Sequence, residues 1–207
     1  MKRVIQNFIA QNNKLVNLKF LFTLIVMTIF TTFYGQEFKE TKDFTITNYK
    51  TALNATKNNE TKNIELFLLK DDQAIGKLID LDTSDLDFFM DVTIKVLENP
   101  ELNNVEKIIK VEFEFLACCF NYESVYFVQT TNNEIIKLQE LDYMQCEYAT
   151  EKTEYIFPNQ KFGKPNVILT TESFLNEDQE TIDINILNTT IWEEKDAVEE
   201  YSYNYKN

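Results

Sequence analysis

Apolar side chains and one threonine recur at spacings of three and four positions between residues 84 and 98, the period of one helix face. They are Leu86, Phe89, Met90, Thr93, Ile94 and Leu97. Ser84 is placed to cap the first backbone N–H groups, and Asp85 and Asp87 suit the positive end of the helix dipole. Pro100 opposes helical geometry in the residue before it. The pattern therefore predicts a helix over about 84–98.

The period changes to two after Pro100, as expected for a strand whose side chains point alternately to two faces. One face carries Ile109, Val111, Phe113, Phe115, Ala117 and Cys119. The opposite face begins with Lys110, Glu112 and Glu114. We therefore expect a strand with one buried face and a second face that begins open to solvent.

Two later stretches are typical of β-hairpins. Residues 124–141 contain Asn132 and Asn133, which can take the positive φ of a two-residue turn. Residues 166–175 and 181–192 alternate in polarity on either side of a short acidic turn. Strands joined by short turns favour an antiparallel sheet or sandwich.

These elements predict an α+β fold in one domain over residues 36–207, mainly an antiparallel β-sheet or sandwich at about 105–205. A smaller helical N-terminal part, with the helix at about 84–98, is expected to pack on the sheet. The segment 64–70 fits a strand or a helix equally well, because a short apolar run does not separate the two.

Residues 1–35 differ in composition from the rest of the chain. Their only charges are basic, on Lys2, Arg3, Lys14 and Lys19, and residues 20–34 carry no charge. A basic start, a short apolar run and a small residue predict a secretory signal peptide cleaved after Gly35, with Gln36 as the new terminus. The leader is similar in style to those of bacterial exported proteins. The alternative is an uncleaved membrane anchor, although a span usually needs about 20 apolar residues.

Acidic side chains dominate the chain once this leader is set aside. The full chain has a formal net charge of −14, and removing the four basic residues of the leader makes it −18. Phosphate backbones and anionic lipid surfaces repel such a polyanion, which argues against nucleic-acid binding and against membrane insertion after cleavage. A cationic protein or a glycan remains a compatible partner. The acidity also fits a domain that is simply kept soluble.

The chain contains no histidine. That composition excludes Cys–His and Ser–His–Asp catalysis, histidine proton shuttles and histidine-ligated zinc. Gly76 and Gly163 stand alone in the sequence, so no glycine-rich phosphate loop is present. An enzymatic role is therefore less expected than a binding role.

Three cysteines remain to be explained: Cys118, Cys119 and Cys146. An oxidising compartment permits a disulfide. We predict one bridge, from Cys146 to Cys119 or to Cys118, with the remaining cysteine free. The alternative is three reduced thiols packed as small core residues.

The acidic stretch 80–91 is the candidate metal site. Asp80, Asp82 and Ser84 occupy positions 1, 3 and 5 of a calcium-type loop, and Asp91 falls at position 12. Position 6, where such loops have glycine, is Asp85. The alternative is a capped helix with an acidic first turn, and no other cofactor is expected.

Aromatic residues near the C-terminus offer a second possible binding surface. Tyr201, Tyr203 and Tyr205, with Trp192, can form a stripe for stacking on sugars or one core face of a terminal strand. The sequence as a whole predicts a periplasmic or extracellular, non-enzymatic binding or structural protein of the bacterial cell envelope. A carboxylate-dependent hydrolase acting on glycans and a calcium-stabilised extracellular module are the alternatives.

Overall fold

The structure is a computed structural model that describes residues 35–48, 63–116, 118–146, 151–176 and 181–193. The chain divides into a unit of residues 1–35 and a unit of residues 36–207, and the elements below belong to the second. Residues 1–34 of the predicted signal peptide, and Tyr201, Tyr203 and Tyr205, lie outside the described residues. No helix within the described ranges is long and apolar enough to cross a bilayer.

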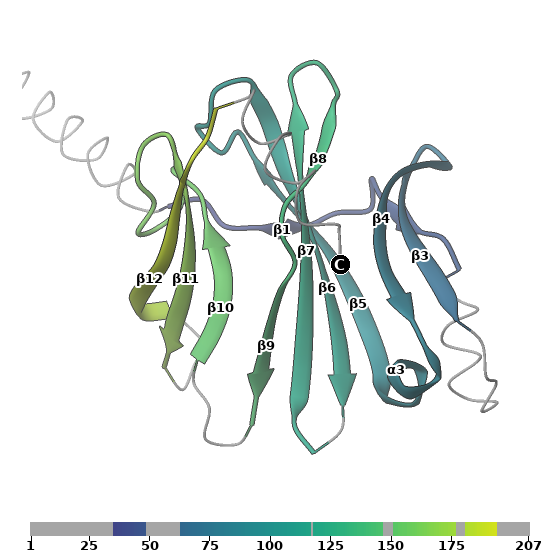
Figure 1. The fold of residues 1–207 in the computed structure, drawn as a ribbon. Helices are drawn as coiled ribbons and strands as arrows, with labels where there is room; N and C mark the ends of the chain where they lie inside the picture. The colour runs from purple at the N-terminus through teal and green to yellow at the C-terminus, as the bar shows by residue number, and fades with distance from the viewer. Residues whose placement is uncertain (1–34, 49–62, 117, 147–150, 177–180, 194–207) are drawn as a thin grey trace, which may run out of the picture. The chain divides into compact units, whose positions relative to one another are not determined.

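Antiparallel strands form nearly all of the regular secondary structure in the described residues (Figure 1). The central sheet has the strand order β1-β5-β6-β7-β8, and β9 also pairs with β7. Its strands are β1 (Lys39–Glu40), β5 (Phe89–Glu98), β6 (Val105–Leu116), β7 (Phe120–Thr130), β8 (Ile135–Lys137) and β9 (Leu141–Gln145).

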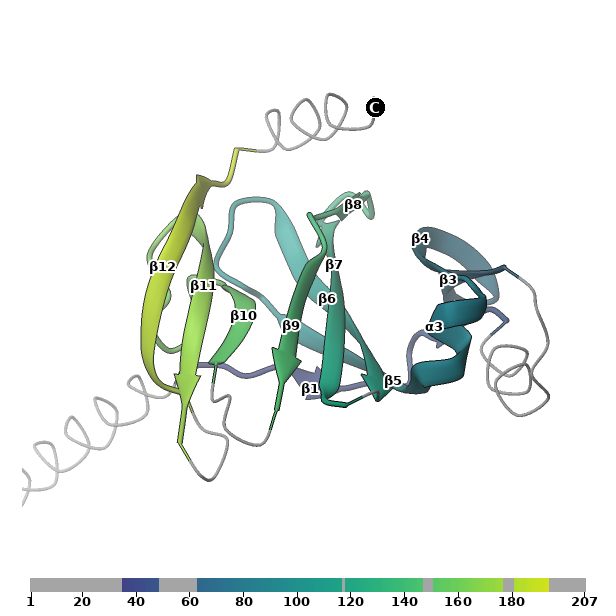
Figure 2. The ribbon, with the colours of Figure 1, turned by 60° about the horizontal axis from the view of Figure 1, so that its bottom comes forward.

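Two smaller sheets, each of three strands within the described residues, complete the fold. One comprises β2 (Thr45–Ile46), β3 (Ile64–Lys70) and β4 (Gln73–Leu81), and the other β10 (Glu151–Ile156), β11 (Val167–Leu175) and β12 (Thr181–Ile191). The short helix α3 (Thr83–Phe88) connects β4 to β5, as Figure 2 shows.

The central sheet is buried on both faces, because alternate residues of its strands enter two separate hydrophobic cores. Ile109 and Phe113 of β6 pack in one core with Leu66 of β3. Ile108 of the same strand packs in the other core with Ile168 of β11. The sheets therefore form three layers, with the strands β5, β6 and β7 in the middle.

The predicted helix at 84–98 and the smaller helical N-terminal part are wrong. Within residues 83–98 only Thr83–Phe88 is helical, and residues 89–98 form β5, which pairs with β6 along its length. Val96 enters the first core and Leu97 the second, so this strand carries apolar residues on both faces. A strand buried on both faces can show the spacing of a helix, because its apolar residues are then separated by three and four positions as well as by two.

The hairpin predictions and the antiparallel sheet are confirmed. β7 pairs with β8, so this hairpin forms, but its connection has four residues instead of the predicted two, and of Asn132 and Asn133 only Asn133 has a positive φ, of 65°. β11 pairs with β12 across the whole of the second predicted hairpin. The ambiguous segment Ile64–Lys70 is the strand β3.

Gly76 of β4 lies against a ring of the central sheet, and this contact requires glycine. A Cβ at this position would lie 2.4 Å from Cε1 of Phe127, whose side chain is 1% exposed. The ring has no solvent to move into, so the two sheets would have to separate slightly.

Substituting Gly76 with alanine is expected to lower the free energy of unfolding by about 1–3 kcal/mol, the usual cost of overpacking. Urea denaturation of the two proteins measures this loss. Phe127→Leu in the Gly76→Ala background should recover part of it, because the smaller side chain leaves room for the methyl group. Additive losses in the double variant would contradict the contact.

β12 is the edge strand of its sheet and exposes apolar side chains. Ile182 is 61% exposed and Ile191 is 65% exposed, while Asp183 is the one charged residue of the strand. Long edges of this kind are templates for pairing with other chains unless charges interrupt them.

Lysine at both positions 182 and 191 is therefore expected to reduce concentration-dependent light scattering while leaving the melting temperature unchanged. Lysine at both Thr189 and Thr190, which are exposed polar positions of the same strand, adds the same charge and is the matched control. A similar reduction from this control would show that net charge, and not the apolar edge, drives association.

Candidate functional site

The side chains between the central sheet and the β10–β12 sheet become less buried toward the β6–β7 hairpin. Along one face of β6, burial falls from Ile108, which is buried, to Leu116, which is exposed. β7 shows the same change on the same face of the sheet, from Val128, which is buried, to Phe120, which is exposed. β10 follows it too, since Ile156 is buried while Glu154 and Lys152, on the same face, are only partly buried. This region is therefore most exposed to solvent at the β6–β7 hairpin.

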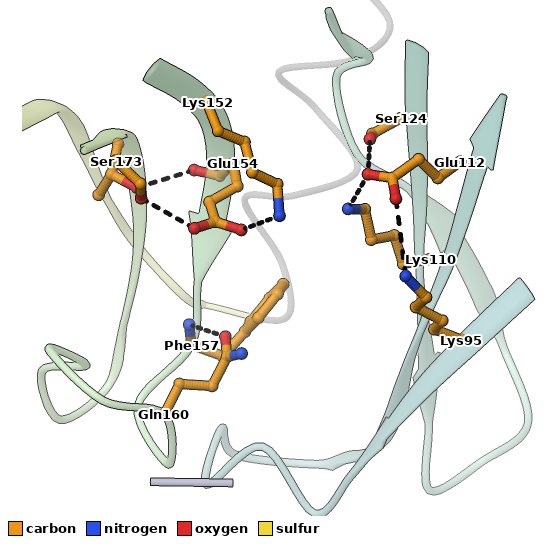
Figure 3. A network of polar contacts seen from close by, with 10 residues as sticks. Lys95, Lys110, Glu112, Ser124, Lys152, Glu154, Phe157, Gln160 and Ser173 are labelled. Carbon is orange, nitrogen blue, oxygen red and sulfur yellow. Dashed lines mark hydrogen bonds and ion pairs between the residues drawn. The ribbon is translucent and has the colours of Figure 1, made fainter. Parts of the chain in front are cut away.

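Charged side chains occupy the middle of this space. We call them the inter-sheet site, defined as Lys95, Lys110, Glu112, Ser124, Lys152, Glu154 and Ser173 (Figure 3). They come from β5, β6 and β7 on one wall and from β10 and β11 on the other. Figure 3 shows the side chains of Lys110 and Lys152 pointing toward each other from the two walls.

Glu112 organises the wall formed by the central sheet. Its Oε2 forms an ion pair with Nζ of Lys110, a residue only 4% exposed, and accepts a 3.2 Å hydrogen bond from Oγ of Ser124. Its Oε1 lies 3.7 Å from Nζ of Lys95. The pair is thus buried but also hydrogen-bonded, as a charge removed from water requires.

Glu154 has the corresponding role on the opposite wall. Its Oε2 lies 2.8 Å from Nζ of Lys152, and its Oε1 accepts a 2.8 Å hydrogen bond from Oγ of Ser173. Oγ1 of Thr171 donates to the backbone carbonyl of Glu154 at 3.2 Å. Each wall therefore presents the same unit of lysine, glutamate and serine.

The two walls act on each other electrostatically. Burial works to raise the pKa of Glu112, but the ammonium of Lys110 outweighs it, with Lys152 across the space and Lys95 adding to the effect. Together they lower the pKa of Glu112 from 4.5 to about 2. Glu112 is therefore ionised at neutral pH and is not a proton donor there.

A row of aromatic rings leads from solvent toward these charges. Phe120, 38% exposed, stacks on Tyr122 with ring centroids 6.3 Å apart, and Tyr122 stacks on Tyr143 at 4.8 Å. Nζ of Lys152 lies 6.0 Å from the centroid of the Tyr143 ring. Burial and the charge of Glu112 raise the pKa of Tyr143, so its hydroxyl stays protonated and can donate a hydrogen bond.

The disulfide prediction is confirmed in its first form. Cys119 and Cys146 are bridged, with Cα atoms 4.8 Å apart, and Cys118 is free and exposed. The bridge ties the β6–β7 hairpin to the chain just after β9. It therefore fixes the rim of the open end of the inter-sheet space.

The candidate calcium ligands are placed as follows. Asp80 pairs with Lys77 at 2.8 Å. Oδ1 of Asp82 accepts from the backbone N–H of Asp85, and Oδ2 of Asp85 accepts from that of Asp82, so the two cap α3 reciprocally. Oδ1 of Asp91 accepts from the N–H of Val92.

Within the described side chains, which do not include that of Ser84, no three acidic or cysteine residues group around a possible metal position. Calcium binding at this stretch stays a prediction. It is tested by whether EDTA lowers the melting temperature and added calcium restores it.

Trp192 lies in the second core and is not part of an aromatic surface. It is 5% exposed, and its Nε1 donates a 3.0 Å hydrogen bond to the carbonyl of Asn103. Of the two alternatives for these C-terminal aromatics, Trp192 therefore fits the core and not a sugar-stacking stripe, and the three tyrosines lie outside the described residues.

A second perturbed carboxyl, on the opposite face of the central sheet, was not anticipated from the sequence. Burial raises the pKa of Glu123 to about 7, and the nearby carboxylates of Glu140 and Asp85 add to the effect. A folded-state pKa above the unfolded value of 4.5 means that the fold favours the protonated form. Stability from this group is therefore complete below about pH 4.5 and is lost as the pH rises through 7.

Glu123→Gln is accordingly expected to raise the free energy of unfolding by about 1–2 kcal/mol at pH 8, after discounting for partial solvent screening. At pH 4 the two proteins should be equally stable, because the native carboxyl is then neutral. Thermal unfolding at both pH values measures the difference. Glu134→Gln in an exposed turn is the control, and a gain that persists at pH 4 would contradict the assignment.

Comparisons of this chain with protein-family models, with curated proteins and with solved structures give no significant match. The fold and the site by themselves define an antiparallel β-sheet protein with a partly buried, ion-paired polar site between two of its sheets.

Proposed function

We propose that this chain is an exported, non-enzymatic binding protein of the bacterial cell envelope, periplasmic or extracellular, that holds its ligand in the inter-sheet site. The supporting observation is the buried Lys110–Glu112 pair, which faces Lys152 and Glu154 at the inner end of a row of aromatic rings. Such a pair is weak support for stability alone, since apolar residues of the same volume often serve a core as well.

Export is supported by two independent features. The basic and apolar leader has the pattern of a secretory signal, and the Cys119–Cys146 bridge is typical of an oxidising compartment. An intact mass beginning at Gln36 would support processing. A full-length mass for the protein isolated from its host would contradict it.

Binding is favoured over hydrolysis by the ionisation of the site. A glycosidase needs one carboxyl that stays protonated near neutral pH to serve as the general acid. Glu112, with a pKa of about 2, is unsuited to that role. Glu112 and Glu154 also each form an ion pair with a lysine.

A carboxylate-dependent hydrolase remains the second candidate because of Glu123. Its pKa of about 7 and its proximity to Glu140 are the properties of a general acid beside a carboxylate. Turnover of chromogenic glycosides that is lost in Glu123→Gln would support this candidate. Absence of turnover across the panel would count against it.

The binding proposal is tested by NMR on the protein purified from an exporting host. Solubilised cell-wall fragments are added as the probe. We expect chemical-shift changes centred on Tyr122, Tyr143 and Lys152, and their loss in Lys152→Gln. Lys42→Gln, at an exposed position away from the site, should behave as the native protein. Shift changes that are absent, or that Lys152→Gln leaves intact, would overturn the proposal.

A further inference from the structure

We infer that the ligand of the inter-sheet site is an uncharged saccharide. The inference rests on the proposed binding function and adds to it the chemical class of the ligand. Three properties of the site support this class: its balanced charge, its unused hydrogen-bonding positions and the aromatic ring at its entrance.

The charges of the site are already matched. Lys110 is paired with Glu112, and Lys152 with Glu154. Lys95 adds a third ammonium, and Glu114 adds a third carboxylate on the same face of β6, since it pairs in register with Tyr122. A charged ligand would have to displace one of these partners, and an anion would also meet the net charge of −14. An uncharged ligand meets neither cost.

Lys95 and Glu112 leave a donor and an acceptor side by side. Their 3.7 Å separation is too long for a hydrogen bond, and Lys95 makes no shorter contact with the described residues. A hydroxyl oxygen can lie within about 2.8 Å of both groups, accepting from the ammonium and donating to the carboxylate. Lys95 is 31% exposed in its side chain, so a ligand can reach this position.

Two serine hydroxyls of the protein already donate hydrogen bonds to the glutamates of this site. Ser124 donates to Glu112 at 3.2 Å, and Ser173 donates to Glu154 at 2.8 Å. The site is therefore built from hydroxyl-to-carboxylate contacts beside ammonium groups. A ligand with several hydroxyls extends that pattern without any change in charge.

The exposed end of the site suits the apolar C–H face of a sugar ring, as its inner part suits the hydroxyl groups. The Phe120 ring is 38% exposed at the open end of the site and stacks on Tyr122 on its inner side. Its exposed surface offers an apolar contact for the C–H face of a pyranose, while the hydroxyls of that sugar or the next one reach inward. An oligosaccharide of a few units would thus contact the ring and the charged groups together.

The experiment is isothermal titration of the exported protein with matched trisaccharides. N-acetylated chitotriose is compared with its de-acetylated, cationic form, and cellotriose with its uronic-acid, anionic form. We expect an uncharged member to bind at least about tenfold more tightly than its charged counterpart. Lys95→Met should weaken that binding about tenfold, as expected for one lost hydrogen bond to a charged group. Lys42→Met should not weaken it.

The outcomes separate this inference from the function on which it rests. Charged members that bind as tightly as their neutral counterparts, or neutral binding unaffected by Lys95→Met, would overturn the saccharide class and leave binding in place. The class also fails if no trisaccharide binds while cell-wall fragments still shift the site residues. If neither binds, both the class and the proposed function fail, and the Lys95–Glu112 gap holds water only.

Discussion

Replacing Glu112 with glutamine is expected to lower the free energy of unfolding by about 3–5 kcal/mol at pH 7. The substitution keeps the size of the side chain but leaves the ammonium of Lys110 buried without its carboxylate. Ser124 and Lys95 lose the charge of the same partner. Urea denaturation at pH 7 measures the loss.

The pH dependence of this loss identifies its cause. The pKa of Glu112 is about 2 in the folded protein, below its ordinary 4.5, so its contribution is complete above pH 4.5 and disappears as the pH falls through 2. The difference between the two proteins should therefore shrink between pH 5 and pH 2. Glu114→Gln, two residues along the same face, is the matched control and should cost less than about 1 kcal/mol. Equal losses from both variants, or a loss independent of pH, would contradict the role of the buried pair.

Cys146→Ala is expected to lower the free energy of unfolding by about 3–4 kcal/mol under non-reducing conditions. The bridge to Cys119 spans a sequence separation of 27 residues. Without it, the unfolded chain gains the conformational entropy of that loop, which favours unfolding. Denaturation in the absence of reductant measures the loss. The same variant should widen the motion of the hairpin at the open end of the inter-sheet site.

Cys118→Ala is the control for the disulfide, because Cys118 is exposed and unbridged. It should leave the stability unchanged. Thiol alkylation of the native protein should label one cysteine before reduction and three afterwards. Labelling of three thiols without reduction, or a large loss of stability in Cys118→Ala, would contradict the Cys119–Cys146 bridge.

Strands were predictable from the sequence where one face is apolar and the turns carry their own signals. The hairpins at Asn133 and between β11 and β12 are of this kind. β5 was not, because a strand in a middle layer carries apolar residues on both faces and loses its period of two. The three-layer arrangement, which follows from long-range packing, explains both the success and the error.

The site was not predictable from alternation. Lys110, Glu112 and Glu114 alternate with apolar residues as the solvent face of a strand does, and we expected that face to begin open. The second sheet covers it, and Lys110 is 4% exposed as a result. Nothing local to 110–114 distinguishes a charge that faces water from one that faces Lys152, which lies 40 positions after Glu112 in the sequence. The disulfide was predictable because the chain has only three cysteines, which leaves few possible pairings.

The order of the layers follows the order of the chain. The β2–β4 sheet is made from residues 45–81, the central strands β5 to β9 from 89–145, and the β10–β12 sheet from 151–191. Within these sheets only the two-residue strand β1 pairs outside its own stretch. Contact order within each layer is therefore low, and a chain emerging from its N-terminus can complete one layer's hydrogen bonding before the next layer is available. Only the contacts between layers, including the charge interactions of the inter-sheet site, require the complete chain.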